Sequence, residues 1–443
     1  MKRPSVVSLF TGAGGLDLGL ECAGFSTRVC VEIDEDARRT LRTNRRDWKL
    51  TEEGDVHKLT PEQVLATAGL EPDGVYLLAG GPPCQPFSKA GYWANGDSAR
   101  LDDPRANTLA AFLKMMEAFL PQVVLIENVS GLTFRNKDEA LKMFKRELRR
   151  INRQHRTRYR LHVLAINAAD YGVPQIRERI FLMAEKGGRE LKLPPPRFHG
   201  PDQDGESKQS MQTEKYRTAW DAIGDLNREA ERQSLRLTGK WAQLIPSIPE
   251  GMNYLWHTKY GGGLPLFGWR SRYWSFLLKL AKSLPSWTLQ AEPGPATGPF
   301  HWDNRLLSVR ELCRLQTFPD AYRVLGTRRI AQRQIGNAVP PAIGEMLGLE
   351  IRRQFLGHKV RNFLKLIPAK RRNCPPPERR HPVSAFFKAQ AGKPKDHPGT
   401  GKGPRARLLK RKADAAATNR ASRSNREYRA PSWASSRTGS PGQ

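Results

Sequence analysis

The sequence predicts a doubly wound α/β fold with a mostly parallel sheet, a smaller second domain and a basic tail. Short apolar runs alternate with helical patterns over residues 1–186, and the unusual side chains fall where the apolar runs end. Such alternation is typical of parallel sheets with helices on both faces, whose ligands bind at the carboxyl ends of the strands. We therefore expect a ligand site at that edge of the sheet.

The expected elements follow one another in a regular order. The strands are SVVSLF at 5–10, TRVCVEID at 27–34, a unit centred on GDVHKL at 54–59, GVYLLAGG at 74–81, QVVLIENV at 122–129, YRLHVLAIN at 159–167 and ERIFLMAE at 178–185. The helices span residues 16–24, 35–44, 61–69, 107–120 and 137–151, and helical patterning returns at 308–318 and after QIGNAVPP. In the helix at 137–151, apolar residues at helical spacing mark one buried face.

Changes in composition divide the rest of the chain. The alternation of strand and helix patterns ends at residue 187. Residues 240–302 then hold six tryptophans among glycines and basic residues, so we expect a separate module over residues 187–300. We expect these tryptophans to form the core of that module rather than to stack on a ligand. Residues 301–355 return to a helical pattern. The segment 356–443, rich in Pro, Ser, Arg, Lys and Ala, is predicted to be a disordered tail.

The charge of the chain indicates a polyanionic partner. The formal net charge is +30 and the pI is near 10.3. Residues 351–443 hold 24 Lys and Arg but 4 Asp and Glu, which leaves 50 and 40 for residues 1–350. Clustered cations gain affinity for nucleic acid by releasing its counterions. We expect the tail to act as a tether that does not read sequence.

Other classes of protein are disfavoured by composition. The five cysteines are scattered and form no CxxC or Cys/His ligand pattern, so the sequence predicts neither a disulfide framework nor a metal site. The first residues break too early for a signal segment, and no apolar run has membrane-spanning length. We expect a cytoplasmic monomer without membrane contact.

Two acids and a glycine-rich turn suggest a nucleotide-like ligand. The turn FTGAGG at 10–15 offers backbone amides and a helix start, but its spacing is not GxGxxG, and such a turn is as often only a tight turn. Glu32 ends the second strand, where an acid can bind both hydroxyls of a ribose, and Asp55 could receive an adenine amino group. Alternatively, Glu32 and Asp55 only cap the following helices.

A cysteine and a second acid suggest covalent chemistry. The stretch GGPPCQPFS at 80–88 holds Cys84 among glycines that allow close approach of a ligand and prolines that stiffen the loop. A positioned thiolate is a strong nucleophile, although a lone cysteine is more often a packing residue. Glu127 and Asn128 follow four apolar residues, and such polar groups are costly unless they face a site.

These motifs, in this order, resemble those of the cytosine-C5 DNA methyltransferases over about residues 5–350. The motifs are FTGAGGLDLGL, the acid of VEID, GGPPCQPFS, ENV, QIRERIF and QIGNAVPP. The resemblance implies the S-adenosylmethionine-dependent methyltransferase fold. It assigns residues 1–186 to the catalytic and cofactor-binding domain, 187–300 to target recognition and 301–355 to completing the catalytic domain.

The resemblance also implies a role for individual residues. Cys84 would add to C6 of a cytosine flipped out of duplex DNA, Glu127 would act as the acid at N3 and the amino group, and Arg177 and Arg179 would lie near the base and its phosphate. Ser88 and Arg100, in a loop expected to close over the base, and Asn128 would contact DNA. The pocket for the methyl donor, S-adenosylmethionine, would be lined by Phe10, Gly12, Gly14, Gly15, Leu16, Glu32, Ile33, Asp55, Pro82, Asn337 and Val339.

The function that we expect is methylation of cytosine C5 within a short DNA sequence, in a restriction-modification system with a restriction endonuclease as its functional pair. A transfer-RNA methylating branch shares the motifs, but the large region 187–300 weighs against it. A non-catalytic DNA-binding regulator would be expected to have lost Cys84, Glu127 or the glycine-rich turn, and all are present.

Overall fold

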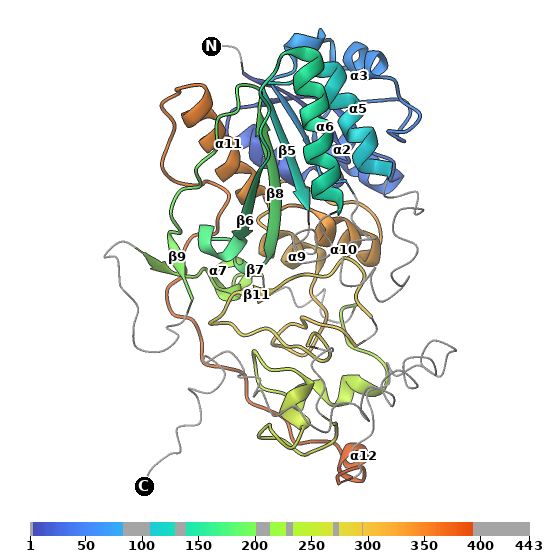
Figure 1. The fold of residues 1–443 in the computed structure, drawn as a ribbon. Helices are drawn as coiled ribbons and strands as arrows, with labels where there is room; N and C mark the ends of the chain where they lie inside the picture. The colour runs from blue at the N-terminus through green and yellow to red at the C-terminus, as the bar shows by residue number, and fades with distance from the viewer. Residues whose placement is uncertain are drawn as a thin grey trace, which may run out of the picture.

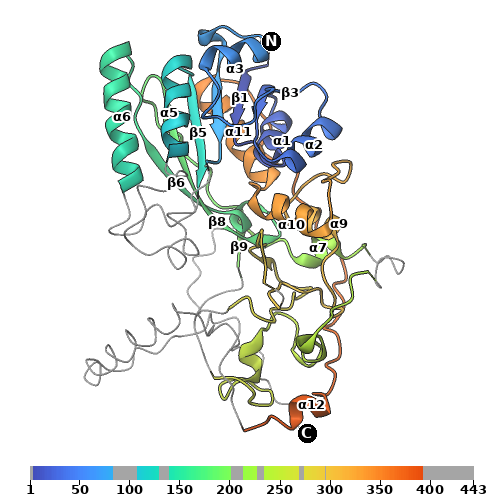
Figure 2. The same ribbon diagram turned by 90° about the vertical axis from the view of Figure 1, so that its right-hand side faces the viewer.

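The protein folds into a sheet domain and an irregular second lobe. The computed structural model describes residues 3–82, 107–128, 139–200, 213–226, 234–268, 274–294 and 296–392. Figures 1 and 2 show the sheet domain at the top and the second lobe below it, with the C-terminal segment running down one side from the first to the second.

A seven-stranded sheet forms the centre of the first domain, in the order β3-β2-β1-β4-β5-β8-β6. Its strands are β1 (Ser5–Leu9), β2 (Ser26–Val31), β3 (Lys49–Leu50), β4 (Leu77–Gly80), β5 (Val123–Asn128), β6 (His162–Asn167) and β8 (Glu178–Glu185). Strands β1 to β5 pair in parallel, whereas β8 is antiparallel to both β5 and β6. The predicted doubly wound, mostly parallel fold is confirmed.

The third strand is not where the sequence predicted it. The strand next to β2 is the two-residue β3, and the segment GDVHKL at 54–59 forms a turn. Within that turn Asp55 Oδ1 accepts a hydrogen bond from the backbone N–H of His57 at 3.0 Å. An aspartate that bonds the backbone two residues further on stabilises a turn at the expense of a strand.

Helices cover both faces of the sheet (Figures 1 and 2). One face is covered by α3 (Pro61–Ala68), α5 (Asn107–Phe119) and α6 (Glu139–His155), and the other by α1 (Gly15–Cys22), α2 (Glu35–Asn44) and α11 (Pro341–Phe355). In β1, Val7 and Leu9 belong to the core between the sheet and α3, α5 and α6, whereas Val6 belongs to the core between the sheet and α1 and α11. This alternation follows from the period of two in a strand.

The strand order fixes the place of a ligand site. From β1 the chain first builds outward through β2 and β3, and it then returns to place β4 and β5 on the other side of β1. The direction in which the chain adds strands to the sheet therefore reverses between β1 and β4. In open α/β sheets, ligands bind outside the carboxyl ends of the strands at such a point.

The second lobe has its own small core. It combines apolar residues between 237 and 306, among them Tyr254, Phe267 and Phe276, with few regular elements. Trp241 and Trp256 pack against this core, which confirms the expectation for these two tryptophans, and Trp269 lies outside the described residues. The expectation is wrong for Trp302, which packs in the first domain with residues of α9 and α10. The remaining elements are β7 (Gln175–Ile176), β9 (Phe198–His199), β10 (Glu214–Lys215), α7 (Ala219–Ile223), β11 (Ser286–Trp287), α9 (Val309–Leu315), α10 (Arg328–Asn337) and α12 (Ala385–Lys388).

The segment after the predicted boundary at 187 stays with the first domain. Leu191 joins the core formed by α1, α11 and the sheet, and Ile223 of α7 packs with residues of α9 and α10. In the described chain, the separate core of the second lobe begins near residue 237.

The C-terminal segment differs from the disordered tail predicted from residue 356. Its described part, up to residue 392, packs on both lobes (Figure 2). Leu364 and Ile367 pack on the α11 side of the sheet, and Glu378 accepts a hydrogen bond from Lys282 Nζ at 2.7 Å in the second lobe. Phe387 of α12 stacks on Trp241 with ring centroids 5.7 Å apart. The composition of this segment did not indicate its packing, because these few apolar residues stand among many prolines and basic residues.

Among the residues that the structure describes, no helix combines the length and apolar character needed to cross a bilayer. Nor do these parts of the chain contain a group of three or more His, Cys, Asp and Glu side chains arranged to hold a metal ion.

We expect Phe387→Ala to lower the free energy of unfolding by about 3 kcal/mol, because truncating a buried phenylalanine leaves a cavity. Phe387 is 2% exposed, whereas its neighbour Phe386 is 53% exposed. Phe386→Ala, the matched control, should cost less than about 1 kcal/mol. Urea unfolding followed by tryptophan fluorescence measures both. Equal losses would contradict the packing of α12 into the second lobe.

Candidate active site

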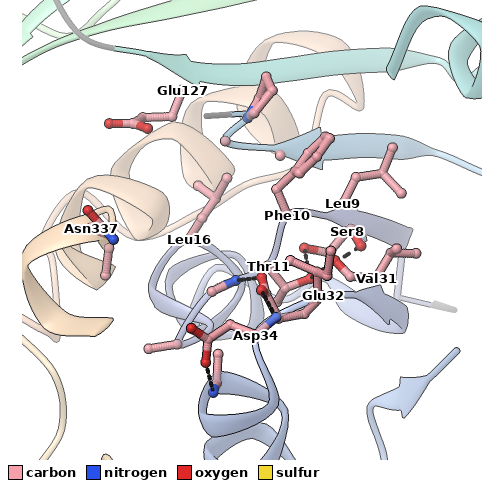
Figure 3. Close-up of a pocket in the computed structure, with 18 of the residues that line it drawn as sticks. Ser8, Leu9, Phe10, Thr11, Leu16, Val31, Glu32, Asp34, Glu127 and Asn337 are labelled. Carbon is pink, nitrogen blue, oxygen red and sulfur yellow. Dashed lines mark hydrogen bonds between the residues drawn. The ribbon is translucent and has the colours of Figure 1, made fainter. Parts of the chain in front are cut away.

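A cavity of about 680 Å³ opens at the point between β1 and β4 where the strand order divides. Its walls come from the ends of β1, β2, β4 and β5, from the first turns of α1 and α2, and from the last turn of α10. Figure 3 shows Glu32 and Glu127 at different ends of this cavity. The fold therefore brings together residues that are distant in the sequence.

The turn after β1 has an unusual backbone. Phe10, Gly12 and Gly14 have φ angles of 54°, 56° and 74°. A left-handed conformation at Phe10 is unfavourable for a side chain with a Cβ, and such strain persists where the surrounding structure enforces it. A Cβ on Gly15 would lie 2.2 Å from the carbonyl oxygen of Val339. The first turn of α1 can therefore approach the segment after α10 only through a glycine.

Glu32 lies at the end of β2 with its carboxylate held by the backbone. Its Oε2 accepts from the N–H of Gly12 at 2.6 Å and its Oε1 accepts from the N–H of Asp34 at 2.8 Å. The residue is 8% exposed, and burial raises the pKa of Glu32, although these backbone bonds act in the opposite direction. Each carboxylate oxygen keeps a second lone pair for a ligand hydroxyl.

Ten of the eleven residues expected around the cofactor line this cavity. They are Phe10, Gly12, Gly15, Leu16, Glu32, Ile33, Asp55, Pro82, Asn337 and Val339. Ile33 is 69% exposed, an unusual degree for an isoleucine, and it presents an apolar surface to the cavity. The exception is Gly14, which does not line the cavity and forms the N-cap of α1 instead.

Glu127 and Arg179 form an ion pair at the other end of the cavity. Arg179 Nε lies 2.9 Å from Glu127 Oε1, and the two side chains are 16% and 12% exposed. The pair joins β5 to β8, and both residues line the cavity together with Asn128. Asn128, predicted to contact DNA, is 7% exposed and is therefore part of the cavity wall.

Arg177 does not join Arg179 at the cavity. It is 1% exposed, and its guanidinium donates to the carbonyl oxygens of Gly336 at 2.7 Å, Ala338 at 3.0 Å and Leu289 at 3.4 Å. Burial lowers the pKa of Arg177 well below its ordinary value. Arg177 therefore holds other segments of the chain in position, whereas the resemblance implied that it would lie near the base and its phosphate.

Three of the predicted site residues lie outside the described residues. They are Cys84, the expected nucleophile, and Ser88 and Arg100, the expected DNA contacts. The chain is described up to Pro82 and resumes at residue 107, and Pro82 and Thr108 both line the cavity.

The sequence reasoning missed three charged residues of the cavity wall. Arg333 of α10 lies 2.6 Å from Asp34 Oδ2, and this ion pair links α10 to the start of α2 beside the cavity. Nothing in the local sequence marks that pair. Asp17, in the apolar helix start LDLGL, is 1% exposed and also lines the cavity. A charge inside an apolar run was its signal, the same signal that identified Glu127.

Comparison with known proteins is consistent with this geometry. The family model for C-5 cytosine-specific DNA methylase matches residues 5–353. The chain belongs to the C-5 cytosine-specific DNA methylase family. The resemblance inferred from the motifs is thereby confirmed, and the protein is a DNA cytosine-C5 methyltransferase.

Relatives and a solved structure that are similar to this methylase match it over most of its length. The chain is 36% identical to the Type II methyltransferase M.SacI of Streptomyces achromogenes, over 77% of this chain and 91% of that one. It is 31% identical to M.NgoFVII of Neisseria gonorrhoeae, over 77% and 84% of the two chains. The fold is similar to that of a DNA modification methyltransferase from an E. coli prophage, with a TM-score of 0.53, 24% identity, and 80% and 100% of the two chains covered.

Arg177 and Arg179 of the methylase should differ in their contribution to the free energy of unfolding. We expect Arg177→Met to lower the free energy of unfolding by about 3 kcal/mol, because buried carbonyl oxygens lose their donor. Arg179→Met should cost less, because water reaches its side chain at the cavity. Guanidinium chloride unfolding of both variants measures the difference. A larger loss for Arg179→Met would contradict the structural role of Arg177.

Proposed function

We propose that this methyltransferase transfers a methyl group from S-adenosylmethionine to C5 of a cytosine flipped out of duplex DNA, through a covalent bond between Cys84 and C6. The supporting observation is one cavity with a ribose-type carboxylate, Glu32, at one end and an acid paired with an arginine, Glu127 and Arg179, at the other. A donor and a base can therefore meet in one enclosed space.

The residues of the cavity fit the proposed donor. Glu32 suits the ribose hydroxyls, Asp55 suits an adenine amino group, and Ile33 and Phe10 offer apolar surface to its ring. Asp17, a buried acid of the cavity wall that forms no ion pair among the described residues, suits a cationic ligand. When bound, S-adenosylmethionine would supply an electrophilic methyl group carried on a sulfonium.

Cys84 and Glu127 together address the chemical difficulty of the reaction. Cytosine C5 is a poor nucleophile on its own. In the proposed step the Cys84 thiolate bonds to C6, a proton from the Glu127 carboxyl passes to N3, and the displaced electron pair becomes available at C5 for the methyl group. Water then takes the C5 proton, and the electron pair of that bond re-forms the C5–C6 double bond as the Cys84 thiolate leaves C6. N3 returns its proton to Glu127. Proton transfer by a positioned acid contributes typically 10²–10⁴-fold.

Arg179 and Arg177 support this chemistry in different ways. Arg179 orients the Glu127 carboxylate at 2.9 Å and adds a donor beside it, so that the base edge would meet both a donor and an acid. Arg177 holds the carbonyls of Gly336 and Ala338, on either side of Asn337 in the cavity wall. Extrusion of the base costs a few kcal/mol, which its contacts in such a pocket offset.

Residues 1–186 and 301–355 serve catalysis and donor binding, and within the region 187–300 the second lobe, from about residue 237, reads the target bases. Ser88 and Arg100 contact DNA, and Asn128 contacts the flipped base from the cavity wall. The basic residues beyond 392 tether the enzyme to the duplex. The likeness to Type II methyltransferases supports protection of host DNA, paired in function with a restriction endonuclease. The enzyme is proposed to act as a monomer in the cytoplasm.

Methyl transfer tests the proposal directly. With S-adenosylmethionine carrying a tritiated methyl group, we expect label in duplex DNA and none in transfer RNA. Cys84→Ser should abolish transfer and Glu127→Gln should slow it about a hundredfold or more. Cys374→Ser, at an exposed cysteine, is the matched control and should retain activity.

Two results would overturn this function. One is label in RNA alone, which would favour the transfer-RNA branch. The other is undiminished transfer by Cys84→Ser, which would exclude the covalent route. Duplex DNA containing 5-fluorocytosine should trap the wild type and not Cys84→Ser, and bisulfite sequencing of host DNA would then identify the target.

Glu32→Gln should weaken S-adenosylmethionine binding by about tenfold or more, because hydrogen bonds to a charged acceptor are stronger than those to a neutral one. Glu35→Gln, three residues further on at an exposed position of α2, should leave the affinity unchanged. Isothermal titration calorimetry measures both. Equal affinities for Glu32→Gln and wild type would contradict the assignment of Glu32 to the ribose.

A further inference from the structure

Asp17 is a buried acid in the wall of the cavity that the proposed mechanism does not use. It lies in the first turn of α1 and is 1% exposed. Its Oδ2 accepts from Ser8 Oγ at 2.9 Å, and the hydroxyl of Thr27 on β2 faces the carboxylate and lowers its pKa. Its Oδ1 is buried beneath the cavity wall, so a charged occupant of the cavity would act on Asp17 through its electric field and not by direct contact.

Ser8 and Thr11 connect Asp17 to the strained turn after β1. Thr11 Oγ1 lies 3.1 Å from Ser8 Oγ, and both residues line the cavity. The turn that holds Phe10 and Gly12 is therefore joined to Asp17 through two hydroxyl groups. A change in the charge of Asp17 would act on the wall against which the donor binds.

The groups around Asp17 leave its charge uncompensated. On its own helix the nearest acid is Glu21, which is paired with Arg45 at 2.7 Å. Cys30 faces it from β2, and Tyr322, whose hydroxyl donates to the carbonyl oxygen of Ala13, faces it from the segment after α9. Among the described residues, Asp17 forms no ion pair. Burial raises the pKa of Asp17 to about 7.

We propose that Asp17 is a positioning residue that distinguishes the methyl donor from its product by charge. The inference rests on the proposed donor, S-adenosylmethionine, whose sulfonium is positive. Transfer of the methyl group leaves S-adenosylhomocysteine, a sulfide without that charge. An ionised Asp17 favours the cation over the sulfide, so it promotes replacement of product by fresh donor after each turnover.

The direction of the pH dependence follows from the charge. Asp17 is protonated below about pH 7 and ionised above it. A cation in the cavity favours the ionised form, so donor binding releases a proton and tightens as the pH rises through 7, whereas sulfide binding gains nothing from Asp17. One unit of change in its pKa corresponds to about a tenfold change in relative affinity.

The empty protein gives an independent signature. Because the folded-state pKa of Asp17 lies above its unfolded value of 3.8, the folded chain binds the extra proton between about pH 4 and 7. The contribution of Asp17 to stability is therefore present at low pH and is lost as the pH rises to 7. In Asp17→Asn, the melting temperature should fall less between pH 5 and pH 8 than in the wild type.

Calorimetric titration of the full chain with S-adenosylmethionine and with S-adenosylhomocysteine, at pH 6 and pH 8, tests the proposal. We expect the affinity ratio of donor to product to rise about tenfold more across this range in the wild type than in Asp17→Asn. Both ligands carry an amino group that also titrates, so the comparison between variants isolates Asp17. Glu35→Gln, the same charge change at an exposed position of α2 outside the cavity wall, should behave as wild type.

The outcomes separate the two proposals. Binding of both ligands, with the same pH response in Asp17→Asn as in the wild type, would overturn the role of Asp17 and leave the proposed donor intact. Failure of the wild type to bind either ligand would overturn the proposed donor, and the role of Asp17 with it. Proton release near pH 7, measured in buffers of different ionisation enthalpy, should accompany donor binding to the wild type and be smaller in Asp17→Asn.

Discussion

The buried guanidinium of Arg177 is the interaction on which the geometry of the site depends. It donates to carbonyls at the end of α10 and to Leu289, in the chain returning from the second lobe. Gln175 extends the same junction, because its Oε1 accepts from the N–H of Leu289 at 3.1 Å. Chain segments more than a hundred residues apart are thereby fixed against the strand pair that also carries Arg179. The cavity wall at Asn337 and Val339 inherits its position from this junction.

The division of the strand order explains why one cavity can serve both ends of a transfer reaction. The carboxyl ends of β1 and β2 supply Phe10 and Glu32, whereas those of β4 and β5 supply Pro82 and Glu127. The proposed donor and base sites therefore lie on opposite sides of one topological boundary. The antiparallel β8 then brings Arg179 beside Glu127, a contact that a wholly parallel sheet would not produce in this way.

The sequence revealed the fold and the two acids of the cavity because their signals are local, whereas most other residues of the cavity were expected from the resemblance to the methyltransferase family. Glu32 and Glu127 are acids that end apolar strands, and a strand directs such residues to the ligand edge. Arg177 and Arg179 looked equivalent in the sequence, because the motif QIRERIF placed both of them near the base and its phosphate. The structure separates them because β7 ends at Ile176 and β8 begins at Glu178, so Arg177 lies in the break between the strands. The packing of Phe387 depends on a distant surface, which composition could not reveal.

The pairing of buried charges distinguishes structural groups from functional ones in this chain. In the second lobe, Lys282 and Glu250 are 3% and 4% exposed and lie 2.8 Å apart, so each charge has its counterion within the fold. Asp17 has no such partner among the described residues, and Glu32 is held only by backbone amides. An uncompensated buried acid is destabilising, so its presence at a cavity favours a ligand that compensates it. The sign of Asp17 fits the cationic donor proposed above, and the acceptor oxygens of Glu32 fit the hydroxyls of its ribose.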